Sequence, residues 1–190
     1  MKVIFRSLLI LLAVFVSVAG AKDKDKAPTL RAKLIGFQEV PVVSTVATGA
    51  FRGVINSDQS ITYDFSYTGL QGAVTQAHIH LAQPGVNGGI VVWLCQTTTN
   101  PAPTNIPLVP TCTPGSGSFT NRTITSADVV AITGANVGQQ VGAGEFSKVL
   151  AAIRAGKAYA NVHSALSTGG EIRGQIKLGG KPDDDDDDED

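Results

Sequence analysis

Two strands joined by a tight glycine loop are predicted by the stretch Gln76-Ala-His-Ile-His-Leu-Ala-Gln-Pro-Gly-Val-Asn-Gly-Gly-Ile-Val-Val-Trp-Leu94. Side chains alternate along a strand, so His78 and His80 point to one face and Ile79 points to the other. The Cα atoms of the two histidines would lie roughly 6.6 Å apart, which is two strand rises. Two imidazoles at that spacing can bind one metal ion.

The chain's third histidine, His163, ends another strand-like run, Ala158-Tyr-Ala-Asn-Val-His163. If this strand lies beside the first one, then His78, His80 and His163 form a three-imidazole site. Such a site suits zinc or copper, with water or a fourth ligand completing the shell.

Three polar residues are candidates for the surroundings of that site. Glu171 and Glu39 could supply a fourth ligand or a hydrogen bond that orients an imidazole, and Asn161 could orient the backbone or a bound water. The alternative is a buried polar cluster without metal. In that case the histidines hydrogen-bond to Glu171, Asn161 and the backbone, and they lock two hairpins together.

Alternation of apolar and polar residues predicts strands along most of the chain. Residues 61–67 alternate as a half-buried strand and form a predicted hairpin with residues 48–56. Residues 90–94 are nearly all apolar, which predicts a central strand covered on both faces. A closing hairpin is predicted for residues 157–163 and 171–178. Many short strands with turn-rich connections indicate an all-β fold, a Greek-key or immunoglobulin-like β-sandwich.

One short helix is predicted at about residues 145–155. Its apolar residues follow the i, i+3, i+4 and i+7 spacing of a single helical face. They are Phe146, Val149, Leu150 and Ile153, and Gly156 then provides a stop.

The chain divides into four predicted segments. Residues 1–21 have the features of a cleavable signal peptide: Lys2 and Arg6, an apolar run too short to span a bilayer, and small residues at the cleavage point. Residues 22–28 form a charged linker, residues 29–179 form one domain, and residues 180–190 form a disordered acidic tail. The expected location is therefore secreted, extracellular or periplasmic, with no membrane attachment after cleavage.

Charge is unevenly distributed along the sequence. The eight residues 183–190 are all acidic, whereas residues 22–182 carry 13 basic and 8 acidic residues. The tail either keeps the protein solvated or collects divalent cations or basic partners. The chain has no basic cluster with interleaved aromatic residues, so no nucleic-acid partner is expected.

Cys95 and Cys112 are the only cysteines. In an exported protein such a pair suggests a disulfide, which would stabilise the fold by roughly 3 kcal/mol. Two buried free thiols are the alternative.

Three groups of motifs together resemble the CHRD domain, a module named after chordin and also found singly in exported microbial proteins. The resemblance runs from about Leu30 to Leu178 and implies an extracellular β-sandwich module that binds a protein or a matrix or surface ligand, without implying an activity. The motifs are Ala32-Lys-Leu-Ile-Gly-Phe-Gln-Glu-Val-Pro41 with Ala47-Thr-Gly49, Ala77-His-Ile-His80 with Gly85-Val-Asn-Gly-Gly-Ile-Val-Val92, and Gly156-Lys-Ala-Tyr-Ala-Asn-Val-His-Ser164 with Gly169-Gly-Glu-Ile-Arg-Gly-Gln-Ile176.

The His-x-His strand is also similar to that of copper/zinc superoxide dismutases. Those enzymes use more histidines and an aspartate to hold two metals, whereas this chain has three histidines in total. Dismutase chemistry is therefore not expected. Motifs of serine hydrolases, phosphate-binding loops and HExxH metalloproteases are absent from the sequence as well.

Two functions follow from these observations. The first, preferred, is a secreted CHRD-type binding module without catalysis, whose histidine site is structural or binds a ligand. The second is a small secreted copper or zinc metalloprotein with redox or hydrolytic activity, which requires an open position on the metal.

Overall fold

A computed structural model describes residues 27–179 of the chain. The predicted signal peptide, residues 22–26 of the predicted linker and the predicted acidic tail lie outside the described residues. Within residues 27–179, no helix is long and apolar enough to cross a lipid bilayer.

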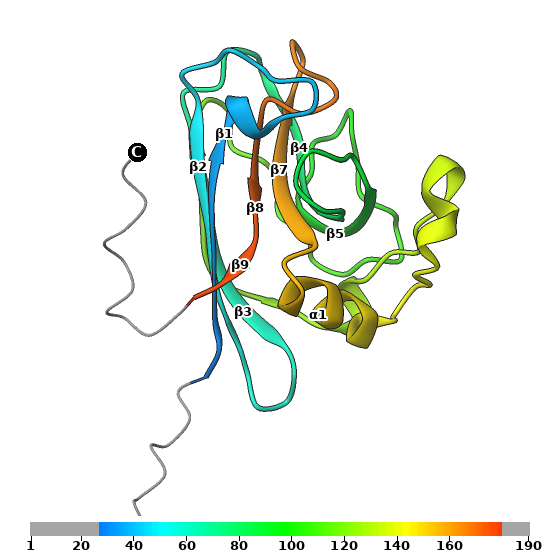
Figure 1. Cartoon of the computed structure of the whole chain (residues 1–190). Coiled ribbons are helices and arrows are strands. Elements are labelled where there is room, and N and C mark those ends of the chain that lie inside the picture. Colours follow the sequence, from blue (N-terminus) through cyan, green and yellow to red (C-terminus); the bar gives the residue numbers. More distant parts are fainter. Residues whose placement is uncertain (1–26, 180–190) are drawn as a thin grey trace, which may run out of the picture.

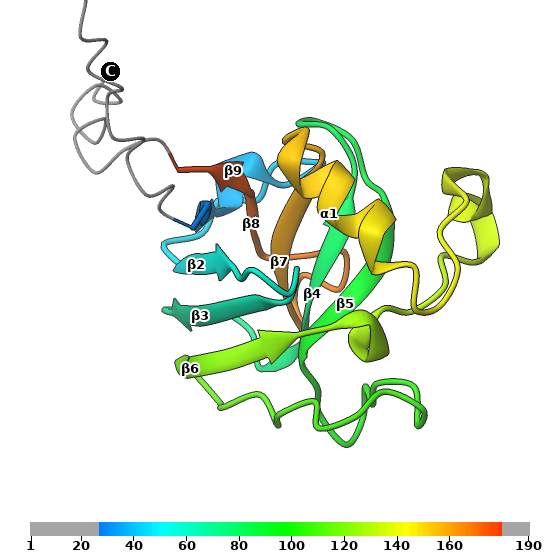
Figure 2. The ribbon, with the colours of Figure 1, turned by 90° about the horizontal axis from the view of Figure 1, so that it is seen from below.

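In this described part of the chain, one antiparallel sheet contains all nine strands, with the strand order β5-β4-β7-β8-β1-β2-β3-β6 and β9 paired to β1. Figure 1 shows the arrangement. The sheet curls until it is nearly closed, as the view from below shows (Figure 2). The prediction of an all-β sandwich-like or barrel-like fold is therefore confirmed. The strands are β1 Thr29–Ile35, β2 Thr48–Ile55, β3 Ile61–Thr68, β4 Val74–Leu81, β5 Gly89–Cys95, β6 Gly117–Ile124, β7 Ala158–Ser164, β8 Ile172–Gln175 and β9 Lys177–Leu178.

The helical elements are few and short. Within the described residues there is one α-helix, α1, which spans Phe146–Arg154, and its buried residues are the four apolar residues of the predicted stripe. The predicted helix is thus confirmed to within one residue at each end. Three 3₁₀ turns complete the set: η1 Gly36–Gln38, η2 Ser126–Asp128 and η3 Gly134–Gln139.

Strands β4 and β7 are buried on both faces, and the two faces differ in chemistry. Ile79 of β4 and Ala160 and Val162 of β7 belong to the hydrophobic core. The alternate residues, which include His78, Asn161 and the other two histidines, form a second buried layer outside that core. The alternation of apolar and polar residues along a strand therefore produces a polar layer against the outer face of the sheet.

The prediction that residues 90–94 form a central strand is wrong about position. Strand β5 lies at one end of the hydrogen-bonded order, although Val91, Val92 and Leu94 are almost fully buried. Loops rather than another strand cover its free edge: the Val130 amide donates to the Val91 carbonyl at 3.0 Å, and the Gln96 amide donates to the Pro110 carbonyl at 2.9 Å. An apolar strand can thus be an edge strand when loops cover it.

The predicted return strand at residues 171–178 is divided in two. Strand β8 pairs with β7, whereas β9 pairs with β1 on the other side of the break. The break falls at Ile176, whose side chain is fully buried and whose amide donates to the Ala158 carbonyl at 2.8 Å. Ile176 thus keeps one hydrogen bond to the start of β7, and the two residues after it, Lys177 and Leu178, pair with β1 and are exposed.

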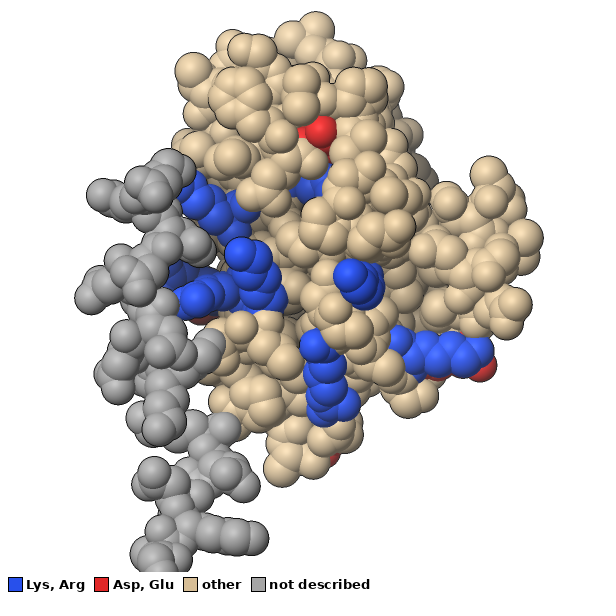
Figure 3. All heavy atoms as spheres, in the orientation of Figure 1, with Lys and Arg blue, Asp and Glu red and all other residues tan. Residues whose placement is uncertain are grey.

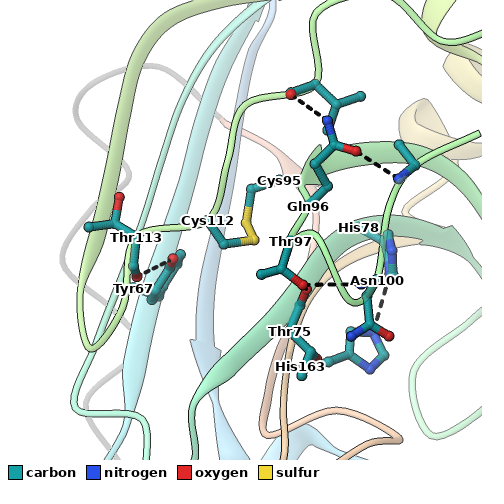
Figure 4. The surroundings of a disulfide bond; sticks show 12 residues. Tyr67, Thr75, His78, Cys95, Gln96, Thr97, Asn100, Cys112, Thr113 and His163 are labelled. Atoms are coloured by element: carbon teal, nitrogen blue, oxygen red, sulfur yellow. Dashed lines mark hydrogen bonds between the residues drawn. A yellow bond between two sulfur atoms is a disulfide. The ribbon is translucent and has the colours of Figure 1, made fainter. Parts of the chain in front are cut away.

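A disulfide joins Cys95 and Cys112, as predicted, with a sequence separation of 17 residues. It ties the end of β5 to the loop that covers the β5 edge (Figure 4). Tyr67 of β3 supports the same loop, because its hydroxyl donates to the Thr113 carbonyl at 2.8 Å.

We expect the double variant Cys95→Ala/Cys112→Ala to lower the free energy of unfolding by about 3 kcal/mol, because opening a loop of this size restores chain entropy to the unfolded state. Urea denaturation of the variant and of the oxidised wild type checks this value. Equal midpoints for the two proteins would contradict it.

Candidate functional site

The three histidines meet in the outer polar layer. Strands β4 and β7 are neighbours, with Gln76 opposite His163 and His78 opposite Asn161. One ring nitrogen from each of His78, His80 and His163 lies within 4.8 Å of those of the other two. All three residues are buried, with exposed fractions of 0 %, 8 % and 6 % in that order.

Backbone carbonyls determine the protonation of two of these rings. The Nδ1 atom of His80 lies 2.9 Å from the Gly88 carbonyl oxygen, and the Nδ1 atom of His163 lies 2.9 Å from the Thr168 carbonyl oxygen. A carbonyl oxygen only accepts, so each Nδ1 must carry the proton and donate it. In a neutral ring the Nε2 atom then carries a bare lone pair, which is the form that binds metal.

His78 completes the set. Its Nδ1 atom lies 3.2 Å from the Nε2 atom of His163, which accepts the Nδ1 proton (Figure 4). The Nε2 atoms of His78 and His80 are buried without a hydrogen-bond partner among the described residues. The site therefore presents two unsatisfied lone pairs next to a third ring whose tautomer is fixed, so the donor set fits one transition-metal ion.

Burial keeps the three rings neutral. It lowers the pKa of His78 well below the usual range, and the neighbouring His163 and His80 lower it further. Burial also lowers the pKa of His80 to about 4 and the pKa of His163, although the hydrogen bond to the Thr168 carbonyl opposes the shift at His163. Neutral rings at physiological pH need not lose a proton before they bind a metal.

Aromatic side chains enclose the cluster. The Trp93 ring from β5 meets the His78 ring edge-on, with centroids 4.2 Å apart. The Tyr159 ring stacks on His80 with centroids 4.8 Å apart. The Cζ atom of Arg173 lies 3.5 Å from the centroid of the Tyr159 ring. Arg173, Tyr159 and His80 thus form one stack.

Arg173 holds the glycine loop that covers the site, a role that its sequence pattern did not reveal. Its side chain, only 2 % exposed, donates to the Asn87 side-chain oxygen at 3.1 Å and to the Val86 carbonyl at 2.7 Å. In the same loop Gly85 has a φ of 76°, and a Cβ at Gly88 would collide with the Leu81 carbonyl. Glycine at these two positions lets the loop lie against the strand.

The predicted partner Glu171 is buried, but it binds another part of the chain. Its carboxylate accepts from the Gln71 amide at 2.6 Å and from the Thr45 hydroxyl at 2.9 Å. Burial alone would raise the pKa of Glu171, yet the hydrogen bonds to the carboxylate outweigh it and lower the pKa. Glu171 therefore ties the segment before β4 to the start of β8, and it lies outside the group of three histidines.

Glu39 and Asn161 form a pair beside the histidines. The Asn161 side-chain amide donates to the Glu39 carboxylate at 2.6 Å, while the Asn161 side-chain oxygen is buried without a partner among the described residues. Burial raises the pKa of Glu39 to about 7, although Arg173 and Asn161 oppose the shift. Glu39 does not join the group of three histidines either.

The comparison with family models matches the CHRD domain over residues 30–176. The chain belongs to the CHRD domain family. No curated protein and no solved structure matches the chain significantly. The family match covers the three histidines, both cysteines and the polar layer around the site.

The three histidines of the CHRD domain are grouped closely enough that they could hold one metal ion. Its three nitrogens would need to approach one another to about 3.4 Å to share an ion at ordinary Zn–N distances. Their present separations of up to 4.8 Å require a shift of about 1 Å. No carboxylate of the described residues belongs to the group, and the rings of Trp93 and Tyr159 contact the rings of His78 and His80.

We expect Glu39→Gln to stabilise the protein at pH 8 and to change little at pH 4.5. The folded-state pKa of Glu39 is raised from 4.5 to about 7, so its contribution is present below pH 4.5 and is lost as the pH rises through 7. The glutamine keeps an oxygen for Asn161 and removes the charge. The gain should be on the order of 3 kcal/mol at most.

Urea denaturation of wild type and variant at the two pH values measures this gain. Glu145→Gln is the control, since Glu145 is half-buried and its carboxylate pairs with Lys148 at 2.7 Å. A stability difference between Glu39→Gln and wild type that is the same at both pH values would show that Glu39 does not titrate in this range.

Proposed function

We propose that this CHRD domain is an exported, non-catalytic binding module whose His78, His80 and His163 hold one copper or zinc ion in a structural role. The observation that carries the proposal is the fixed tautomer of two rings. Backbone carbonyls accept hydrogen bonds from the Nδ1 atoms of His80 and His163, so Nε2 is the basic nitrogen of each ring. The Nε2 atom of His80 has no partner among the described residues, and that of His163 accepts a hydrogen bond from His78, which a bound ion would replace.

A metal at this position would connect parts of the chain that are distant in sequence. His78 and His80 lie on β4, and His163 lies at the end of β7. The hydrogen-bond partners of the rings belong to the loop that ends at Gly88 and to the turn that contains Thr168. The ion would therefore stabilise two loops as well as two strands.

Exposed apolar side chains on a third loop support the binding role. Phe37, Val42 and Val46, in the connection between β1 and β2, are 66 %, 67 % and 80 % exposed. Figure 3 shows that the end of the molecule with this loop has few charged side chains on the face drawn. Exposed apolar surface of this kind is typical of interaction sites, and it suits an extracellular protein or another surface ligand.

Two features support export. The Cys95–Cys112 disulfide is a bond that persists in oxidising compartments, and the first 21 residues have the composition of a signal peptide. We therefore place the mature protein outside the cytoplasm. A separate proposal is that the acidic residues 183–190 bind divalent cations.

The metalloenzyme alternative requires an open metal position that a substrate can reach. The three histidines are at most 8 % exposed, and Trp93 and Tyr159 contact two of their rings. These surroundings favour a structural ion over a catalytic one.

We expect the purified chain to bind about one copper or zinc ion. Trp93 is the only tryptophan, and its ring lies 4.2 Å from His78. Copper(II) at the site should therefore quench the fluorescence of the protein, whereas zinc should compete without quenching. Fluorescence titration and elemental analysis of the dialysed protein measure the two effects.

His80→Gln and His163→Gln should each weaken binding by more than about 100-fold, because each removes a ligand, whereas loss of a group that only orients a ligand costs 10- to 100-fold. Ile79→Val is the matched control: it lies between two of the histidines but faces the core. That control should cost about 0.5–1.5 kcal/mol of stability and leave metal binding intact. A wild type that takes up neither metal would overturn the proposal.

A further inference from the structure

Basic side chains form a row across three neighbouring strands, on the opposite side of β8 from the histidine strands. Arg31 of β1 is directly opposite Arg52 of β2 and directly opposite Lys177 of β9. All three residues are exposed. Lys33, two residues after Arg31 on β1, is also exposed and shares its face. We call these four residues the cation row.

Strand pairing alone makes the cation row unfavourable. Side chains directly opposite each other on an antiparallel pair have Cβ atoms about 4.5–5.5 Å apart, and like charges at that distance are destabilising. The next residue along the row is Asp64 of β3, which is opposite Arg52. Among the described residues of these strands, Asp64 is the one carboxylate in line with the cation row, so the strands themselves carry an excess of positive charge on this face.

Figure 3 shows the same excess in space. Among the residues coloured in this view, Lys and Arg side chains gather over β1, β2 and β9, with few acidic side chains beside them. The surface is therefore suited to a ligand with several closely spaced negative charges.

The sequence places such a ligand next to the row. The acidic segment begins six residues after Lys177. It consists of eight consecutive acidic residues, Asp183-Asp-Asp-Asp-Asp-Asp-Glu-Asp190. Six extended residues reach at most about 20 Å. The row crosses two strand spacings, about 10 Å, so the chain is long enough to bring the acidic segment over all of its cations.

We propose that the acidic segment, residues 183–190, binds the cation row of its own domain and thereby keeps external polyanions from that surface. The contact is electrostatic, so it weakens as the Debye length falls to about 3 Å at 1 M salt. The proposal rests on the strand register and on the charge of the two segments, and it is independent of metal binding at the histidines.

Zero-length carbodiimide cross-linking followed by peptide mass spectrometry tests the contact directly. We expect amide bonds between carboxylates of residues 183–190 and the amines of Lys33 and Lys177 in the monomer at low salt. Lys148 is the internal control: it lies 2.7 Å from Glu145, so a Lys148–Glu145 cross-link shows that the reagent works. Tail cross-links to Lys148 should be rare, and 1 M salt should abolish those to Lys33 and Lys177.

The variant Arg31→Gln/Arg52→Gln removes charge from the row and keeps both reactive lysines. It should lower the yield of the two tail cross-links roughly two- to tenfold, the effect of losing two surface charge pairs. Tail cross-links that spread evenly over all lysines, that reach only Lys22, Lys24 and Lys26, or that occur only in cross-linked dimers would each overturn the intramolecular contact.

Binding to immobilised heparin, a sulfated polysaccharide, tests the competition. Deletion of residues 183–190 should raise the salt concentration needed for elution, and Arg31→Gln/Arg52→Gln in the deleted chain should reverse most of that rise. Replacement of the eight acidic residues by Asn and Gln should act like the deletion. Elution that is unchanged by the deletion, or a rise that persists in the row variant, would show that the tail does not mask this surface.

Discussion

Burial of the outer face of β4 and β7 is the constraint on which the rest of the polar layer depends. One face of these strands lies against the hydrophobic core, and loops cover the other face, so polar groups on the outer face lose their contact with water. A buried polar group without a partner costs about 1–3 kcal/mol. His80, Asn161 and His163 therefore have to find partners in those loops, and the loops must adopt the conformations that supply them.

Two buried ionisable residues meet this requirement in different ways. Arg173 directs its guanidinium to acceptors of the glycine loop, including the Val86 carbonyl, and lies over the Tyr159 ring. Glu171 directs its carboxylate to the Gln71 amide and to Thr45. Glu171 directly precedes β8 and Arg173 lies within it, yet the two residues hold loops from different parts of the chain. The two charged groups thus bind loop residues and do not pair with each other.

The sequence allowed the strands and the histidine pattern to be predicted, because both depend on local alternation. In the run that ends at His163, small apolar residues alternate with larger polar or aromatic ones, and strand geometry places the two sets on opposite faces. The pairing of β4 with β7 depends on tertiary topology, so the sequence could not predict it. The three-histidine site was therefore predicted only on the condition that these two strands lie side by side. The role of Arg173 was hidden for a related reason: an alternating charged strand is typical of an open face, and this face is closed by loops more than 80 residues away in sequence.

The same reasoning from local sequence predicted the wrong position for β5, which is an edge strand and not a central one. A run of apolar residues predicts burial on both faces, and Val91, Val92 and Leu94 are indeed buried. Burial does not require a neighbouring strand on each side, however, because the disulfide-bonded loop at Cys112 and the Val130 amide cover the edge. Sequence patterns report whether a side chain is buried, and they do not report which element buries it.

The histidine cluster differs from the other polar groups because the described residues leave it partly unsatisfied. Gly88 and Thr168 provide acceptors for one nitrogen of His80 and of His163, but the Nε2 atoms of His78 and His80 have no partner there. A metal ion would convert these costly lone pairs into ligands. The unfolded chain keeps His78 and His80 close but separates them from His163 by more than 80 residues, so an ion that needs all three would favour the folded state. Its binding free energy would then add to the stability of the fold in proportion to RT ln(1 + [M]/Kd), where [M] is the free metal concentration, which links the order of both loops to the supply of metal.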